Sequence, residues 1–301
     1  MAYSKITLPA RDLSALFESL GSLSDKPERL FALVNVADLD ETRILEILPW
    51  AATGSETINL YSDLGNSGLI KLGPRLFELS DDPTAQQHLL ELALNTRSVA
   101  LLWSQAPQQV LAEHLQNLRE VSLADGKAAL FRFQDTKVAS ALFPVLPLSQ
   151  HDILLGPLRR WVVIGPCCEL HALEHVPSTE SATTLAFDKA TTRALDEALF
   201  EHTIEAQIDE TDSSLLLQLT YCQRHQRINR YLQDARARGL TKSADLSLYC
   251  ILAFQLPEGF DKRAPFARAL HFKENGFATF GAALDAVVPE EWTIWDDHLN
   301  K

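Results

Sequence analysis

The chain has 301 residues, of which 46% are hydrophobic, and its formal net charge at pH 7 is -13. This length predicts two domains, because a domain commonly holds about 100–200 residues, and the apolar share is sufficient for a packed core. The excess of carboxylates repels phosphate backbones and anionic lipid headgroups. We therefore expect neither nucleic acid nor a membrane among the partners of this chain.

The N-terminal segment has no basic stretch followed by an apolar one, which argues against a secretory signal peptide. No part of the sequence approaches the roughly 20 consecutive apolar residues of a membrane-spanning helix. A cytoplasmic location is the expectation that follows.

The first half of the chain alternates apolar runs with amphipathic segments, which predicts an α/β lobe with a mixed sheet and flanking helices. Residues 30–36 (LFALVNV) are almost wholly apolar, as expected of a strand buried on both faces. The sequence Ala124-Asp125-Gly126 between two strand-like runs predicts a hairpin. The expected strands, in chain order, are residues 30–36, 57–61, 75–79, 98–103, 119–123, 127–133 and 159–164.

Helices are expected between these strands, where apolar residues repeat with helical spacing or a capping residue comes first. Asp135 is the expected N-cap of a helix at residues 136–143. Ser149, with Asp152 as its capping-box partner, is the expected start of the next helix. Gly156 is expected to end that helix in the left-handed conformation. The other helices of this half are expected at residues 40–48, at residues 83–95 and after Pro107.

The segment after the last strand changes character, with two prolines, many serines and threonines and no clear periodicity. We expect it to connect the α/β lobe to an all-helical lobe, either without regular structure or with one more short strand or hairpin. The expected boundaries are residues 1–165 for the α/β lobe, 166–184 for the linker and 185–301 for the helical lobe. The helices expected in the second lobe are residues 189–208, 213–238, 243–254, 264–270 and 276–287.

The sequence lacks the common motifs for nucleotide binding and catalysis: G-x-x-x-x-G-K-[ST], G-x-G-x-x-G, H-E-x-x-H and G-x-S-x-G. His202 beside Glu201, and His225, fall in helical segments among polar residues. A solvated helix face explains them more simply than a positioned general base. We therefore expect no cofactor and no enzymatic activity. The alternative is a hydrolase or transferase with an unrecognised site near His171 or His202.

Two cysteines and two histidines, Cys167, Cys168, His171 and His175, lie within nine residues. Zinc takes such ligands tetrahedrally. Their spacing matches no established zinc finger, and a solvated linker that happens to hold them is the alternative. We therefore assign no metal here, and metal analysis of untagged protein would decide the point.

Trp292 and Trp295 stand three residues apart in an acidic C-terminal segment, where leaving both rings in water is costly. Either they pack back on the body of the protein or they anchor a partner.

Residues 130–133 are expected to form a central strand that runs into a helix. Phe131 and Phe133 then point to one face, with Leu130 and Arg132 on the other. An arginine within such a strand needs an anionic or carbonyl partner, and Asp135 is a candidate. Either the pair fixes the turn from strand to helix, or Arg132 is an exposed polar anchor beside an apolar groove.

Two stretches, LFRFQD at residues 130–135 and LGPLRRW at residues 155–161, carry a resemblance to a known family. They resemble the domain that marks effector chaperones and adaptors of bacterial type VI secretion systems, of the domain-of-unknown-function 4123 type. The LFALVNVA strand, the LGPRL turn and the SVALLW strand come in the matching order, so the resemblance covers about residues 30–164. Gln134 departs from the aromatic residue usual at its position.

The resemblance implies a non-enzymatic protein that binds a cognate toxic effector, through the effector's N-terminal region. It also implies that the protein loads this effector onto the spike protein (VgrG-type) of the secretion machine. A scaffold without any link to secretion is the remaining alternative. The partner-binding candidates are Arg132, Asp135, Arg160, Trp161, Trp292 and Trp295.

Overall fold

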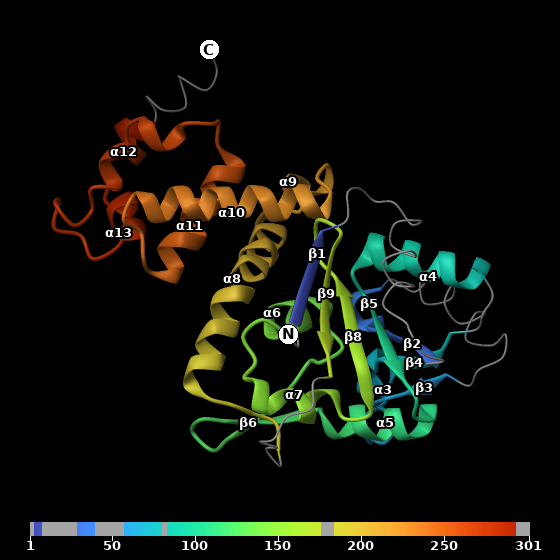
Figure 1. Cartoon of the computed structure of the whole chain (residues 1–301). Coiled ribbons are helices and arrows are strands. Elements are labelled where there is room, and N and C mark those ends of the chain that lie inside the picture. The colour runs from blue at the N-terminus through green and yellow to red at the C-terminus, as the bar shows by residue number, and fades with distance from the viewer. Residues whose placement is uncertain (1–2, 8–28, 40–56, 80–82, 176–183, 293–301) are drawn as a thin grey trace. The chain divides into compact units, whose positions relative to one another are not determined.

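The computed structural model describes residues 3–7, 29–39, 57–79, 83–175 and 184–292 (Figure 1). It divides into two compact units, Met1–Leu199 and Phe200–Lys301. The division falls inside helix α8 (Lys189–Asp212), whereas the sequence placed a linker at residues 166–184. The predicted fold class, an α/β lobe followed by a helical one, is confirmed. In the described part of the chain, no helix is both long and apolar enough to cross a membrane.

Seven strands of the first unit form one sheet in the order β1-β9-β8-β5-β2-β4-β3. Every neighbouring pair in it is antiparallel, so the parallel pairing expected of a mixed sheet does not occur here. The strands are β1 (Tyr3–Thr7), β2 (Arg29–Val34), β3 (Ile58–Asn59), β4 (Arg75–Glu78), β5 (Val99–Ser104), β8 (Leu158–Ile164) and β9 (Glu169–Glu174).

Both faces of this sheet are buried, because successive side chains point to opposite sides. On β2, Phe31 and Leu33 belong to one hydrophobic cluster, and Ala32 and Val34 belong to a second one. Helix α4 (Pro83–Thr96) packs on the sheet in the second cluster. The helices that pack on it in the first cluster are α5 (Gln108–Asn117), α6 (Thr136–Leu142) and α7 (Leu148–Leu155). Figure 1 shows α4 on one side of the strands and α6 and α7 on the other. The sheet is thus the middle of three layers, which explains the continuous apolar runs of its central strands.

A second sheet has the order β10-β6-β7 and contains one parallel and one antiparallel pair. Its strands are β10 (Ala186–Phe187), β6 (Glu120–Leu123) and β7 (Ala128–Leu130). The predicted hairpin is confirmed, with Gly126 at φ 80° and the Asp125 side chain accepting from the Lys127 N–H at 3.1 Å. β7 ends at Leu130, however, so the expected central strand through Phe133 is wrong. β7 is instead a short end strand of the smaller sheet.

Strand β9 lies inside the segment that the sequence predicted as a linker, between β8 and β1 in the large sheet. Its buried positions include Glu169 and His171 as well as leucines, so it lacks a simple apolar alternation. Glu169 accepts from the backbone N–H of Cys167 at 2.7 Å and pairs with Lys5 at 3.4 Å. Tyr3 Oη lies 3.0 Å from Nδ1 of His171. These partners keep two polar side chains satisfied inside the sheet.

Some helix boundaries differ from the expectation. The expected loop after Gly65 contains helix α3 (Ser67–Leu72), which Asn66 caps by accepting from two backbone N–H groups. α7 begins directly after Pro147, whose φ of -58° already suits a helix, so Ser149 is not its N-cap. The helix expected at residues 40–48 lies outside the described residues.

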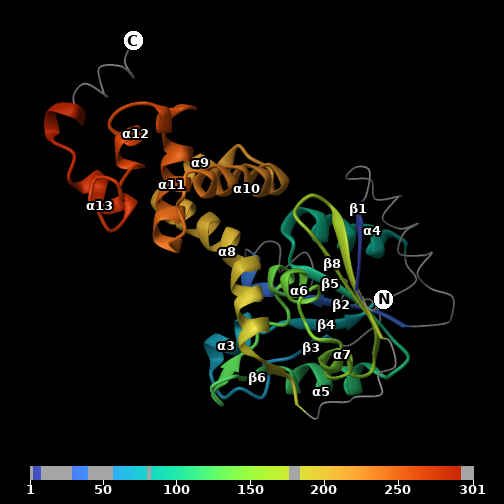
Figure 2. The same ribbon diagram turned by 60° about the vertical axis from the view of Figure 1, so that its left-hand side comes forward.

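The second unit consists of short helices around a core rich in phenylalanine and tyrosine (Figure 2). The single helix expected at residues 213–238 is two helices, because Thr220 and Gln223 form a capping box that starts a new one. Beyond α8, the elements are α9 (Ser214–Leu217), α10 (Tyr221–Ala237), α11 (Ser243–Gln255), the 3-10 helix η2 (Phe260–Lys262), α12 (Phe266–Ala269) and α13 (Phe280–Asp285).

Candidate protein-binding surface

The aromatic residues of the 130–161 stretch form part of the first unit's core. Trp161 is 1% exposed, and its ring lies edge-on to Phe133 at 6.4 Å and to Phe143 at 5.9 Å between centroids. Phe131 makes a similar contact with Phe187 of β10 at 5.5 Å. Trp161 therefore offers no surface to a partner and acts as a packing residue.

Leu130 and Arg132 lie on the opposite side of the same stretch and are exposed. The Leu130 side chain is 70% exposed and that of Arg132 is 50% exposed, as the predicted alternation requires. The guanidinium of Arg132 pairs with the buried Asp135 carboxylate at 3.2 Å. Asp135 also caps α6 by accepting from the Lys137 N–H at 3.0 Å, which confirms the predicted cap. The structure therefore has the predicted pair at the turn and leaves part of Arg132 open to solvent.

The Arg132–Asp135 pair is coupled to a second polar segment that follows β2. Asn35 is fully buried and donates to the Asp38 carboxylate at 2.8 Å. Burial raises the pKa of Asp38, and the Asp135 charge raises it further, against smaller opposing contributions from Lys137 and Arg132. Oδ1 of Asn35 is buried without a hydrogen-bond partner among the described residues. The fold thus brings residues 35–38 and 132–137 to one electrostatically coupled site.

Asp135 is expected to matter more for stability than Arg132. We expect Asp135→Ala to lower the free energy of unfolding by about 1 kcal/mol through loss of the cap. Arg132→Ala should cost less than about 1 kcal/mol, because half of the Arg132 side chain is exposed and the buried Asp135 keeps its hydrogen bond from the Lys137 N–H. Urea denaturation followed by circular dichroism measures both. Asp135→Asn, which keeps an oxygen at the cap, should retain most of the stability, and a larger loss in Arg132→Ala than in Asp135→Ala would contradict this assignment.

Two other partner-binding candidates are engaged within their own units. Arg160 on β8 donates through Nε to Glu174 at 3.1 Å, and its guanidinium lies 5.8 Å from the ring centre of Trp103. Trp292 packs edge-on to Phe266 at 5.4 Å, which matches the packing alternative for this residue. Trp295 lies outside the described residues. Among the described candidates, Arg132 is therefore the side chain most open to a partner.

The Cys167–His175 segment does not gather its side chains around one point. His171 lies within strand β9, and Nε2 of His175 lies 3.5 Å from the Asp152 carboxylate. In the described residues, no three histidine, cysteine, aspartate or glutamate side chains are grouped as metal ligands would be.

His202 and His225 belong to a polar cluster of side chains from α8 and α10. Glu201 Oε1 lies 2.6 Å from Nδ1 of His225, and Oε2 accepts from Asn229 at 2.5 Å. Burial raises the pKa of Glu201, but the hydrogen bond and charge of His225, with His202 and Asn229, outweigh this and hold it below its ordinary value. The cluster is more closely paired than the solvated helix face that the sequence predicted.

Gly156 in the LGP sequence is required by its surroundings. It ends α7 at φ 51° and ψ -114°, so φ is positive as predicted but ψ lies outside the left-handed helical region. A Cβ at this position would lie 2.3 Å from the His114 ring. Nε2 of His114 donates to the Leu154 carbonyl at 3.1 Å, so moving the ring aside would break this hydrogen bond. The glycine therefore permits a close contact between α5 and the end of α7.

The first unit is expected to lose stability as the pH falls below about 6.5. Burial lowers the pKa of His114 and His151 below the ordinary 6.5, against smaller opposing contributions from their carbonyl partners. The unfolded chain therefore takes up protons first, and the stability that is complete above pH 6.5 declines below it. Thermal unfolding at a series of pH values measures this. The double variant His114→Gln/His151→Gln keeps side-chain donors but cannot take up a proton, so its stability should fall less steeply below pH 6.5. Parallel stability curves for the variant and the parent would refute this prediction.

The exposed Leu130 and Arg132 lie in a part of the chain that matches a known family. Residues 30–152 match the family model described as a domain of unknown function, DUF4123. The match runs from β2 into α7 and includes both polar segments of the coupled site. It does not include Trp161 or the helical unit. Searches of curated proteins and of solved structures gave no match to the chain.

Proposed function

We propose that this chain is a non-enzymatic adaptor chaperone of a bacterial type VI secretion system. In this role it binds the N-terminal region of a cognate toxic effector in the cytoplasm and delivers the effector to the spike protein. The observation that supports this most directly is the DUF4123 match over residues 30–152. It covers the LFRFQD stretch, one of the two on which the resemblance to these adaptors rests.

The exposed end of β7 is the part of the matched region best suited to dock a polypeptide. β7 is an end strand, so one of its sides has no neighbouring strand among the described residues. Leu130 supplies an exposed apolar side chain there, and Arg132 follows it with a half-exposed guanidinium. An extended segment of the effector can add to such an edge through backbone hydrogen bonds, while side-chain contacts give selectivity.

Co-expression with the effector encoded beside this gene tests the proposal. We expect a stable complex that survives affinity purification and size-exclusion chromatography. Leu130→Glu should weaken the complex, because it puts a charge where an apolar contact forms. Leu148→Glu is the matched control, since Leu148 is a similarly exposed leucine of the same unit on α7. Failure to co-purify with any neighbouring effector or spike protein would overturn the proposal.

Two further observations distinguish the proposal from its alternatives. A scaffold without a link to secretion would lack effector, immunity and spike genes in its neighbourhood. A hydrolase or transferase would have its site near His171 or His202, and His202 adjoins the Glu201–His225 pair, whose atoms are 2.6 Å apart. Glu201→Gln should leave effector binding unchanged if the adaptor proposal is right.

A further inference from the structure

The helical unit contains a basic region in an acidic chain. Between residues 221 and 273 there are ten lysine and arginine residues but four aspartate and glutamate residues, a net charge of +6. The chain as a whole carries -13. Residues 221–273 are thus positively charged, whereas the rest of the chain is negatively charged.

Two of the four carboxylates in this region are consumed by the fold. Asp245 is buried and accepts from the backbone N–H groups of Phe280 at 3.0 Å and Gly281 at 3.4 Å. Asp261 is buried, pairs with Arg238 and accepts from the Tyr249 hydroxyl at 2.9 Å. Asp234 and Glu258 remain from this stretch, and from outside it Glu205 pairs with Arg224 and Glu291 pairs with Arg268. The balance at the surface of this region is therefore positive.

The arginines of α10 are held against aromatic rings. The guanidinium carbon of Arg227 lies 5.0 Å from the Phe254 ring centre, and its Nε donates to the Tyr231 hydroxyl at 3.0 Å. Arg230 lies over the same Tyr231 ring at 5.1 Å. Arg227 has no carboxylate partner among the described residues, and Arg230 pairs with the exposed Glu258 at 3.5 Å. Stacking fixes these guanidinium groups while their outer N–H donors remain available.

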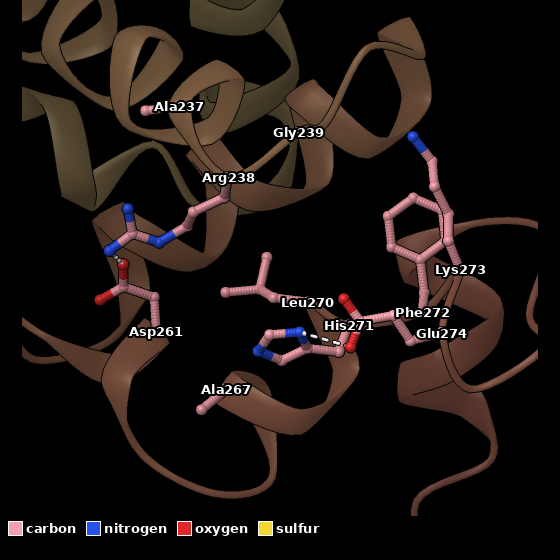
Figure 3. Close-up of a pocket in the computed structure, with 10 residues that line it drawn as sticks. All are labelled: Ala237, Arg238, Gly239, Asp261, Ala267, Leu270, His271, Phe272, Lys273 and Glu274. Atoms are coloured by element: carbon pink, nitrogen blue, oxygen red, sulfur yellow. Dashed lines mark ion pairs between the residues drawn. The ribbon is translucent and has the colours of Figure 1, made fainter.

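Two hollows of about 430 Å³ each lie in this part of the unit; Arg230 lines one of them, and Arg238 lines both. The first is lined by Arg230, Tyr231, Tyr249 and Lys262, among others. The two hollows share Arg238 and Asp261, so the buried ion pair separates them. Figure 3 shows the second hollow. The Arg238 side chain reaches Asp261 on one side of it, and Lys273 lies on the opposite side.

We infer that Arg227, Arg230, Arg238 and Lys262, here called the basic face, bind an acidic, extended segment of a partner protein. Arg227 and Arg230 fall on one side of α10, because residues three apart share a helix face, and Arg238 is the C-cap of the same helix. Planar guanidinium groups bind carboxylates through paired N–H donors, and the hollow beside them has tyrosines for the intervening side chains. The overall charge of -13 opposes nucleic acid, whereas a short acidic peptide needs only the local positive field.

This inference goes beyond the proposed function and does not depend on secretion. The test uses the full chain and a fluorescein-labelled peptide of alternating glutamate and alanine, followed by fluorescence anisotropy at low salt. We expect this peptide to bind and a matched lysine–alanine peptide not to bind. Arg227→Gln/Arg230→Gln should weaken binding by about tenfold or more, since each lost charge-assisted bond contributes. Arg193→Gln is the control, because Arg193 is 81% exposed and lies in the first unit.

Unchanged affinity in the double variant, or equal binding of the lysine peptide, would overturn the inference. The inference would also be overturned if a single-stranded oligonucleotide bound more tightly than the acidic peptide and the double variant lost that binding. The basic face would then be a nucleic-acid site. Circular dichroism establishes that each variant is folded. If the double variant unfolds, Arg230→Gln alone decides the question, because that side chain is largely exposed. Peptide binding without effector co-purification would leave this inference standing and remove only the proposed function.

Discussion

Trp161→Ala is expected to lower the free energy of unfolding of the first unit by about 3–5 kcal/mol, the usual cost of truncating a buried large aromatic residue. Trp161 is among the largest fully buried side chains of the described residues and contacts the rings of Phe133 and Phe143. The cavity left by its removal would lie at the point where β8 meets α6. Chemical denaturation followed by far-ultraviolet circular dichroism measures the loss, because tryptophan fluorescence would itself change.

Trp161→Phe is the matched variant for this prediction. Phenylalanine keeps an aromatic ring in the same space, and it removes an indole N–H that is buried without an acceptor among the described residues. The loss of packing is therefore partly offset by removal of an unsatisfied donor. We expect Trp161→Phe to cost less than half as much as Trp161→Ala. Equal losses in the two variants would show that packing of this ring is not what stabilises the unit.

The parts of the fold that the sequence predicts correctly are those governed by local patterns. The central strands β2 and β5 and the second half of β8 are apolar runs, and a sheet covered on both faces requires such runs. The hairpin follows from Asp125-Gly126, since glycine adopts the positive φ that the turn needs. Asp135 as the N-cap of α6 likewise depends only on residues two positions apart.

The parts that the sequence does not predict depend on residues far apart in the chain. The segment that contains β9 was assigned to a linker with at most one short strand or hairpin, because it lacks a clear periodicity. Its buried Glu169 and His171 have partners on β1 that the local sequence does not show. β1 and β10 were not predicted either, because each depends on pairing with a strand over 60 residues away. The break between α9 and α10 was visible in principle, since Thr220 and Gln223 have the spacing of a capping box.

The same distinction applies to the candidate sites. The Arg132–Asp135 pair joins residues three apart and was predicted, whereas its coupling to Asn35 and Asp38 requires the sheet. The basic face was not predicted, although a count of charges along residues 221–273 would have indicated it. The net charge of the whole chain concealed this region, because the carboxylates elsewhere outnumber its arginines.

The second large effect is expected at Asp261, which organises the wall between the two hollows. We expect Asp261→Ala to destabilise the helical unit by about 2–4 kcal/mol, because it leaves the Arg238 guanidinium without its carboxylate. The lower part of that range is favoured, since the Arg238 side chain is 27% exposed and water can solvate part of the charge. Asp261→Ala also removes the acceptor of the Tyr249 hydroxyl.

Asp261→Asn separates these two contributions. It keeps an oxygen that can accept from Tyr249 but removes the charge that pairs with Arg238, so we expect a loss between zero and that of Asp261→Ala. Glu258 lies three residues before Asp261, and its side chain is 89% exposed. Glu258→Ala should therefore change stability by less than about 0.5 kcal/mol. Urea denaturation of all three variants gives the comparison. If Asp261→Ala were no worse than Glu258→Ala, Asp261 would not hold Arg238 in place, and the geometry of the basic face would need another explanation.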